Sequence, residues 1–442
     1  MELLIYIELL VVLAAIFIGA RVGGIGLGIF GMMGLAILVF VFGLKPGSAP
    51  IDVMLMIVAV ITAASALQSA GGLDYLVQVA EKILRKNPSM VTFLAPVVCY
   101  FFTFFSGTGH VAYSLLPIIA EIATESKVRP ERPMSISVIA SQQAITASPI
   151  SAATAALLSK DLLGTHGVEL SDILMVCIPA TLIGVIVGAF VVNFIGVPLE
   201  KDPEYQRRLA EGMLGNSQDK KKTLDPQQQR KAKTAVWIFL LGVLSIVLFG
   251  SVASLRPAFA DGSRLGMPEI IEIVMMTVAG LIFIIAKADV TKAVKGSVFL
   301  AGMQAVIAIF GIAWMGDTFF QGNLEFFKSS IEHIVTEYPF LFSLALFVMS
   351  ILLFSQAATV RTLYPLGIAL GIPPMTMVAM FPAVNGYFFI PNYPTVVAAI
   401  NFDRTGTTRI GKYVLNHSFQ IPGFVATIVA LAVGYVIVLT MG

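Results

Sequence analysis

Long apolar runs decide what this chain can fold into. Each run is long enough, or nearly so, to cross the roughly 30 Å hydrocarbon core of a bilayer as a helix. Backbone groups cannot stay unpaired in lipid, and the alternating pattern of a membrane barrel is missing, so we predict an all-α polytopic membrane protein. The runs cover residues 3–20, 22–43, 51–70, 172–196, 234–252, 270–286, 297–315 and 414–440.

Composition supports the same class and argues against an enzyme. Hydrophobic residues make up 57% of the chain and charged residues 12%, whereas a soluble domain carries about 25% charged residues. The sequence has no Walker loop, dinucleotide fingerprint, zinc spacing or nucleophile elbow. The glycine-rich GARVGGIGLGIFG lies in an apolar run, which is typical of close helix packing. We therefore expect no catalysis, no cofactor, no metal and no nucleic-acid partner.

A polar, charged stretch at residues 200–233 divides the chain into two halves, 1–199 and 234–442, and the halves resemble each other. Each half has an apolar segment that begins at a proline (Pro88, Pro339), reaches Phe-Ser and a short polar patch, and then meets a second proline. Further along, ITASPISAA in the first half corresponds to FIPNYPTVVAA in the second. Several matches in the same order indicate an internal repeat.

The repeated segments predict interrupted helices. The apolar arms beside SGTGH and SQAAT are too short to span comfortably, so we predict re-entrant hairpins at 89–124 and 340–372. The segments 134–158 and 375–401 contain SPIS and IPNYP, where proline breaks a helix. Each half then has five spans plus one hairpin. Because five is odd, the two repeats are inverted in the membrane.

The distribution of lysine and arginine gives the orientation. With the N-terminus outside, the basic clusters fall on the inner side, including the linker 200–233. Cytoplasmic loops carry such an excess of positive charge. We therefore expect a cytoplasmic linker and two periplasmic termini.

The four interruptions are the candidate site. A broken helix exposes N–H groups with partial positive charge, which bind carboxylates. A two-fold arrangement of such donors suits a dicarboxylate, although these residues would also serve simply to satisfy the broken backbone. The candidates are Ser106, Gly107, Thr108, Gly109, Ser148, Pro149, Ser151, Ser355, Gln356, Thr359, Asn392, Tyr393, Pro394 and Thr395.

Three ionisable residues lie near these interruptions. A charged arginine is energetically costly at membrane depth. Arg361 therefore holds a substrate carboxylate, extends its charged end to water, or packs against a nearby Glu or Asp. His110 either accepts a proton or donates a hydrogen bond to the substrate, or it is a structural histidine. Asp403 begins DRTGTTRIGK, where we favour a turn cap or an arginine pair over a binding role.

The combination of GARVGGIGLG, GGLDYLV, GTGH, RPERP, ITASPISAA, SQAAT, IPNYPT and DRTGTTRIGK resembles the anaerobic C4-dicarboxylate transporters, the Dcu family, and leans toward its A-type branch. The resemblance covers essentially the whole chain. It implies exchange of fumarate, malate or aspartate for succinate across the bacterial inner membrane. It also implies an elevator fold like that of the ion-transporter superfamily, with a dimeric scaffold, so we expect a homodimer.

Other functions remain open on sequence alone. One is a sodium- or proton-coupled symporter for the same acids, and another is an amino-acid carrier. A receptor that binds the acid without moving it would need a signalling domain, for which residues 200–233 are too short and too polar.

Overall fold

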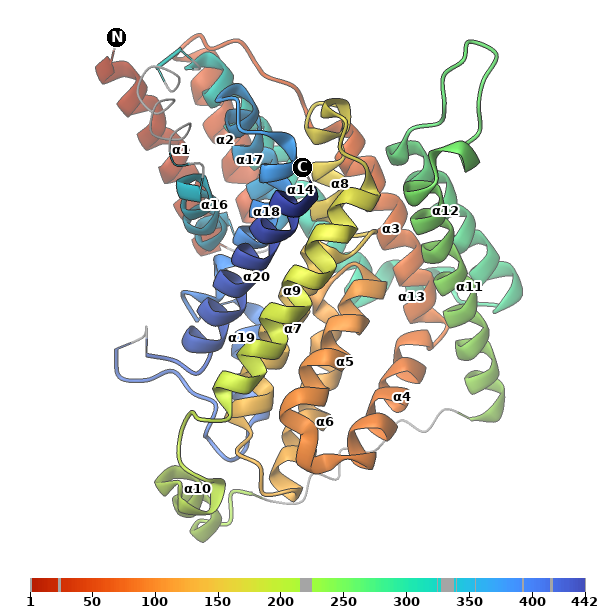
Figure 1. Ribbon diagram of the computed structural model, residues 1–442, viewed down its shortest axis with the longest axis vertical. Coiled ribbons are helices and arrows are strands. Elements are labelled where there is room, and N and C mark those ends of the chain that lie inside the picture. Colours follow the sequence, from red (N-terminus) through yellow and green to blue (C-terminus); the bar gives the residue numbers. More distant parts are fainter. Residues whose placement is uncertain are drawn as a thin grey trace.

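The computed structural model describes residues 2–22, 25–214, 225–323, 325–326, 338, 340–353, 355–391, 393–413 and 416–441. Every named element in these residues is helical, and an isolated bridge between Ala258 and Arg264 is the only β pairing among them. The predicted all-helical class is confirmed. Figure 1 shows the helices running mostly along the long axis of the molecule.

The first half contains nine α-helices in its described residues. They are α1 (Glu2–Val22), α2 (Gly26–Phe40), α3 (Ile51–Ser69), α4 (Gly72–Lys86), α5 (Val91–Ser106), α6 (Ala112–Glu125), α7 (Glu131–Ala147), α8 (Ala152–Leu157) and α9 (Leu170–Val192).

The linker and the second half continue with further helices. These are α10 (Pro203–Ala210), α11 (Pro226–Ser251), α12 (Met267–Ile285), α13 (Val290–Lys295), α14 (Ser297–Gly322), α16 (Phe340–Leu353), α17 (Gln356–Ala369), α18 (Pro374–Met380), α19 (Pro394–Phe402) and α20 (Gln420–Met441).

Seven helical stretches in the described residues are long and apolar enough to cross a membrane. They are Ile51–Ser69, Pro88–Ser106, Leu170–Val192, Pro226–Ser251, Met267–Ile285, Ser297–Gly322 and Gln420–Met441. Shorter apolar helices cover Leu3–Gly19, Gly26–Phe40 and Phe340–Leu353. These helices establish a polytopic membrane protein. The finer expectation, ten spans arranged as two inverted repeats, stays a prediction.

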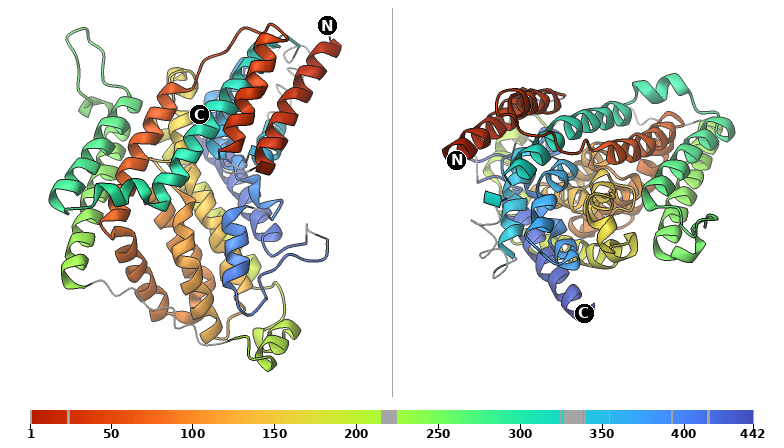
Figure 2. Two further views of the ribbon diagram at one scale, coloured as in Figure 1. Left: turned by 180° about the vertical axis from the view of Figure 1, so that it is seen from behind. Right: turned by 90° about the horizontal axis from the view of Figure 1, so that it is seen from above.

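The helices form two groups. Seen from above in Figure 2, α1, α2, α14, α3, α12 and α11 follow one another as a curved wall. Helices α5, α7, α9 and α20 pack together beside that wall, and the short helices α8 and α17 lie between the two groups. The wall closes tightly where α2 crosses α14, because a Cβ on Gly31 would lie 2.6 Å from the backbone of Gly311. The glycine-rich segment therefore serves close helix packing, as its composition indicates.

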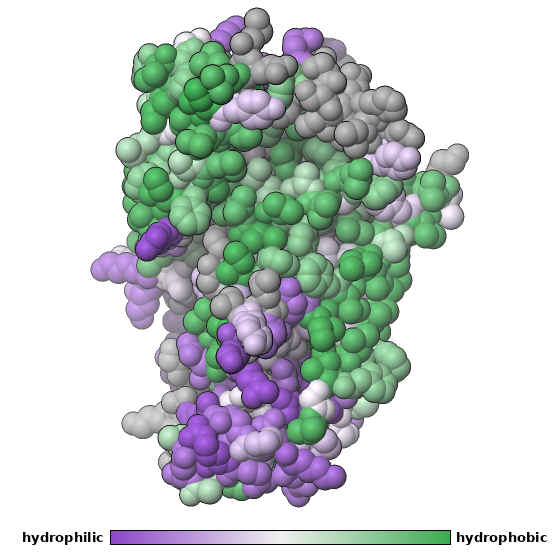
Figure 3. Space-filling view, turned by 90° about the vertical axis from the view of Figure 1, so that its left-hand side faces the viewer, coloured by the Kyte–Doolittle hydropathy of each residue, from purple (hydrophilic) through white to green (hydrophobic). Residues whose placement is uncertain are grey.

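The outer surface has the polarity of a membrane protein. Figure 3 shows hydrophobic side chains over the upper and middle part of one side, with hydrophilic side chains gathered at the end where α10 lies. The N-terminus lies near the opposite end (Figure 1).

Two elements differ from expectation in their bounds. Helix α11 begins at Pro226, inside the stretch 200–233, because Asp225 caps it and Gln228 completes a capping box. The second interruption is also longer than IPNYP, since α18 already ends at Met380 and two 3₁₀ turns, Phe381–Val384 and Gly386–Phe388, follow it.

Candidate functional site

The turn between α5 and α6 packs against the break between α7 and α8. Gly107 ends α5 with a φ of +70°, a conformation that favours glycine. A Cβ at this position would lie 2.8 Å from the carbonyl oxygen of Ile150. Across the same contact, the Ser148 hydroxyl donates to the carbonyl of Phe104 at 2.7 Å. The α5–α6 turn, the tip of the predicted first hairpin, is therefore in close contact with the break between α7 and α8.

Serine residues cap the N-termini of α8 and α17, the helices that follow two of the interruptions. Ser151 accepts a hydrogen bond from the Thr154 N–H at 3.1 Å at the start of α8. Ser355 does the same for the Ala358 N–H at 3.2 Å at the start of α17. These two helices pack against each other. Each serine satisfies one of the unpaired N–H groups of its helix, so these two side chains are partly structural.

A buried polar network joins the interruptions of the two halves. Gln142 of α7 donates to the Thr395 hydroxyl at 3.0 Å and accepts from the Tyr387 hydroxyl at 2.6 Å. Gln356, the first residue of α17, donates to the same Tyr387 oxygen at 2.7 Å. The Gln142 amide also lies against the first hairpin, since a Cβ on Gly109 would come within 2.9 Å of it. Through Gln142 and Tyr387, both hairpin turns and the start of α19 meet at one place.

The network continues toward α20. Asn385 accepts from Gln356 at 3.2 Å and donates to Gln143 at 3.2 Å. Gln143 in turn donates to the hydroxyl of Thr427 at 2.9 Å. All of these side chains are buried, and every one is neutral. The centre of this group of helices thus holds hydroxyls and amides that can exchange their present partners for the oxygens of a carboxylate.

The structure places the expected site residues in three groups. Gln356 and Thr395 belong to the network, and Gly107, Gly109 and Ser148 shape its surroundings. The hydroxyls of Ser106 and Thr359 bond to nearby backbone carbonyls. Tyr393 stacks on Tyr387 at 4.5 Å, and Pro394 is the first residue of α19.

Four further expected residues lie in turns or outside the described part of the chain. Thr108 and Pro149 lie in the turns themselves. Asn392 and the side chain of His110 lie outside the described part of the chain.

Arg361 is engaged by an acid outside the network. Its Nη2 contacts Asp161 Oδ2 at 2.7 Å, and its Nη1 donates to the Ser159 hydroxyl at 3.0 Å. Burial works against ionisation of Asp161, but the hydrogen bond and positive charge of Arg361 outweigh it and lower the pKa of that carboxyl. The expectation that Arg361 packs against a nearby acid is therefore met by Asp161.

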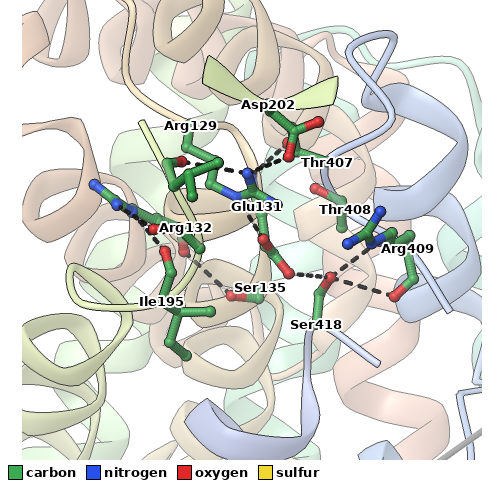
Figure 4. Close-up of polar contacts among 12 residues, drawn as sticks. Arg129, Glu131, Arg132, Ser135, Ile195, Asp202, Thr407, Thr408, Arg409 and Ser418 are labelled. Carbon is green, nitrogen blue, oxygen red and sulfur yellow. Dashed lines mark hydrogen bonds and ion pairs between the residues drawn. The ribbon is translucent and has the colours of Figure 1, made fainter. Parts of the chain in front are cut away.

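A second polar cluster lies at the end of the molecule that carries α10 (Figure 4). Buried Arg129 contacts Glu131 and Asp202, both at 2.6 Å. Glu131 accepts from Ser418 at 2.7 Å, and its backbone N–H donates to Thr407. The cluster joins the start of α7, the linker and the loop after α19.

Asp403 shapes the loop of this second cluster. It accepts from the Thr407 hydroxyl at 2.8 Å and from the Thr408 N–H at 2.6 Å. Asp403 is thus a turn cap, the role favoured from sequence.

Sequence reasoning missed Gln142, Gln143, Asn385 and Tyr387. Two adjacent glutamines inside a segment that is otherwise small and apolar are an available signal, because an amide at membrane depth needs a partner. Asn385 gives the same signal, since it is an amide in an apolar segment and precedes a glycine, whereas Tyr387 gives none.

An all-helical membrane protein with a buried neutral polar centre between helix ends has the architecture of a membrane transporter. The chain belongs to the family of anaerobic C4-dicarboxylate membrane transporters that comprises DcuA and DcuB, whose family model matches residues 4–442. Members of this family are named as transporters, not as enzymes.

Individual relatives cover nearly the whole chain. The C4-dicarboxylate transporter DcuA of Wolinella succinogenes is 45% identical over 97% of this chain and 98% of its own length. DcuA of Escherichia coli K12 is 44% identical over 98% of this chain and 99% of its own. The anaerobic C4-dicarboxylate transporter DcuB of Escherichia coli CFT073 is 40% identical over 98% of both chains.

A solved structure shares the fold. Neisseria gonorrhoeae MtrF, described as illuminating a class of antimetabolite efflux pumps, superposes with a TM-score of 0.55. The match covers 91% of this chain and 84% of MtrF at 12% sequence identity. At that identity the likeness concerns the fold alone.

Proposed function

We propose that the protein exchanges C4-dicarboxylates, among them fumarate, malate, aspartate and succinate, across the bacterial inner membrane. The relatives named as C4-dicarboxylate transporters support the substrate class. The cargo would bind at the network of Gln142, Gln356, Asn385, Tyr387 and Thr395, with the remaining interruption residues around it.

The observation that carries this proposal is the way the network draws on both halves. Gln142 comes from the first half, whereas Tyr387, Gln356 and Thr395 come from the second. A two-ended anion is best held by donors that arrive from opposite sides. Neutral amides and hydroxyls bind carboxylates without adding a permanent charge, so they also release them readily.

The proposed motion is an elevator. Helices α1, α2, α3, α11, α12 and α14 would form the fixed scaffold, through which two copies would pair. The hairpins and broken helices would carry the cargo past it. In the proposed orientation the linker faces the cytoplasm and both termini face the periplasm.

Counterflow in proteoliposomes tests the exchange. Vesicles loaded with succinate should take up labelled fumarate rapidly, whereas empty vesicles should take up little, with or without sodium or proton gradients. Uptake into empty vesicles that depends on an ion gradient would instead establish the symporter.

Binding measured by heat release tests the substrate class. Fumarate, succinate, malate and aspartate should bind, and citrate, with its third carboxylate, should not. Competition by aspartate against labelled fumarate measures how far the site tolerates an ammonium group. A protein that binds aspartate but no plain dicarboxylate would be an amino-acid carrier.

A further inference from the structure

A cavity of about 300 Å³ opens at the end of the molecule opposite α10. The loop before α3, the segment after α8, and helices α14 and α17 line it. Its principal side chains are Lys45, Ser48, Asp161, Asp317, Gln321 and Pro365. Asp317 is held in place by the Ser48 N–H at 2.8 Å, whereas Asp161 faces the cavity and the buried Arg361 at once.

The Arg361 guanidinium has an unused donor. Its side chain is only 4% exposed, and Nε has no hydrogen-bond partner among the described residues. A guanidinium binds a carboxylate best through two parallel N–H bonds, but Asp161 contacts Nη2 and does not contact Nε. A buried, charged donor without a partner is costly and calls for a physical explanation.

We propose that Arg361 is a second carboxylate site, at which a carboxylate of the cargo displaces Asp161 on its way between the cavity and the central network. The arriving carboxylate would take both Nε and Nη2, which restores the missing hydrogen bond. This inference rests on the proposed transport of dicarboxylates and adds a step to it.

Asp161 is placed to leave. Its side chain is 45% exposed, so it can rotate into the cavity while Arg361 stays buried. Lys45 lines the same cavity and offers the released carboxylate another cation. Replacing one carboxylate by another at Arg361 keeps the buried charge paired throughout, which avoids the large penalty of an isolated ion.

The second site is joined to the first by one short helix. Gln356 of the central network and Arg361 both lie on α17, five positions apart, which is about 7.5 Å along a helix. Binding of a carboxylate at Arg361 therefore occurs on the same helix that carries Gln356 of the central network.

The displacement of Asp161 by a cargo carboxylate is tested by whether variants at the pair bind succinate more tightly or more weakly. Asp161→Asn removes the competing charge but keeps a neutral acceptor, so calorimetry should show succinate binding about fivefold tighter. Arg361→Lys keeps the charge but loses the two-donor edge, so binding should weaken about tenfold. Thermal unfolding in detergent shows which variants are folded.

Asp317→Asn is the matched control, since it removes a carboxylate from the same cavity that forms no ion pair with Arg361. It should not tighten binding. If the Arg361–Asp161 pair is only structural, Asp161→Asn leaves an unpaired buried cation and binding weakens or stays unchanged. Either result overturns the proposal. An Arg361→Lys variant that binds succinate with wild-type affinity also overturns it, and this variant can be measured even if Asp161→Asn does not fold. Counterflow by the unaltered protein decides the proposed function separately.

Discussion

At the scale of single residues, the Tyr387 hydroxyl is the centre of the buried network. It accepts from Gln356 and donates to Gln142, and so connects side chains from both halves of the chain. A phenol suits this position because it offers one donor and one acceptor from a rigid ring. The ring itself is held by stacking on Tyr393.

Tyr387→Phe should weaken succinate binding about tenfold, or about 1.4 kcal/mol, because it removes one hydrogen-bond partner from each of two buried amides, Gln142 and Gln356, while keeping the ring. Calorimetry measures the affinity and thermal unfolding the stability. Tyr364→Phe is the control, since Tyr364 is equally buried but donates to the carbonyl of Met377 instead. It should lower stability by about 1 kcal/mol and leave affinity unchanged. Equal effects on affinity in both variants would contradict a role for the network in binding.

Residue types at the breaks were predictable, whereas their partners were not. Serine, glycine and proline in an apolar run announce an interruption, and such signals led to Ser151, Ser355 and Gly107. The pairing of Gln142 with Tyr387 spans 245 positions, and that of Arg361 with Ser159 spans 202. Nothing local in a single sequence records contacts of that separation.

At the scale of elements, the first hairpin depends on its contact with the α7–α8 break. Gly107→Ala should be destabilising for two reasons, the positive φ and the approach to Ile150. Gly167→Ala is the matched control, since its φ is +79° but nothing lies within 4 Å of the added Cβ.

Gly167→Ala should lower the free energy of unfolding by about 1 kcal/mol because of the backbone conformation alone. The Gly107 variant should unfold at a lower temperature than the Gly167 variant and lose counterflow activity. Similar unfolding temperatures would mean that the hairpin does not need this contact.

The ends of a helix can be predicted from the sequence where a capping side chain or a proline fixes them. The start of α8 and the start of α19 at Pro394 agree with local rules. The 3₁₀ turns between Phe381 and Phe388 were not predicted, although Pro382 and the pair Asn385-Gly386 are local turn signals in that stretch. Tertiary contacts stabilise these turns, including the hydrogen bond that the Gly386 N–H donates to the Ser350 hydroxyl at 2.8 Å.

At the scale of the whole molecule, the cluster around Arg129 ties the linker to both halves. Burial disfavours the charged form of Asp202, but hydrogen bonds from Arg129 and from the Tyr205 backbone outweigh it and lower its pKa. A depressed pKa in the folded state stabilises the protein above the unfolded pKa, and this stabilisation is lost as pH falls. Asp202→Asn should therefore lower the unfolding temperature at pH 7, and by less at about pH 2, which lies below the unfolded pKa of the carboxyl. An equal loss at both pH values would show that the charge is not responsible.

Orientation in the membrane can be tested with single cysteines. The native Cys99 and Cys177 are buried, so they should not react. Ser254→Cys and Ala210→Cys introduce exposed thiols at opposite ends of the molecule. An impermeant maleimide should label Ser254→Cys in intact cells, and Ala210→Cys only after the membrane is opened. The reverse pattern would invert the proposed topology.

The neutrality of the central network has an electrical consequence. Its amides and hydroxyls offset none of the charge of a bound dianion, and moving two charges across the bilayer is worth about 4.6 kcal/mol at a potential of 100 mV. Exchange of one dianion for another cancels that work over a complete cycle, so the exchange should produce no net current and its final distribution of substrates should not depend on the voltage.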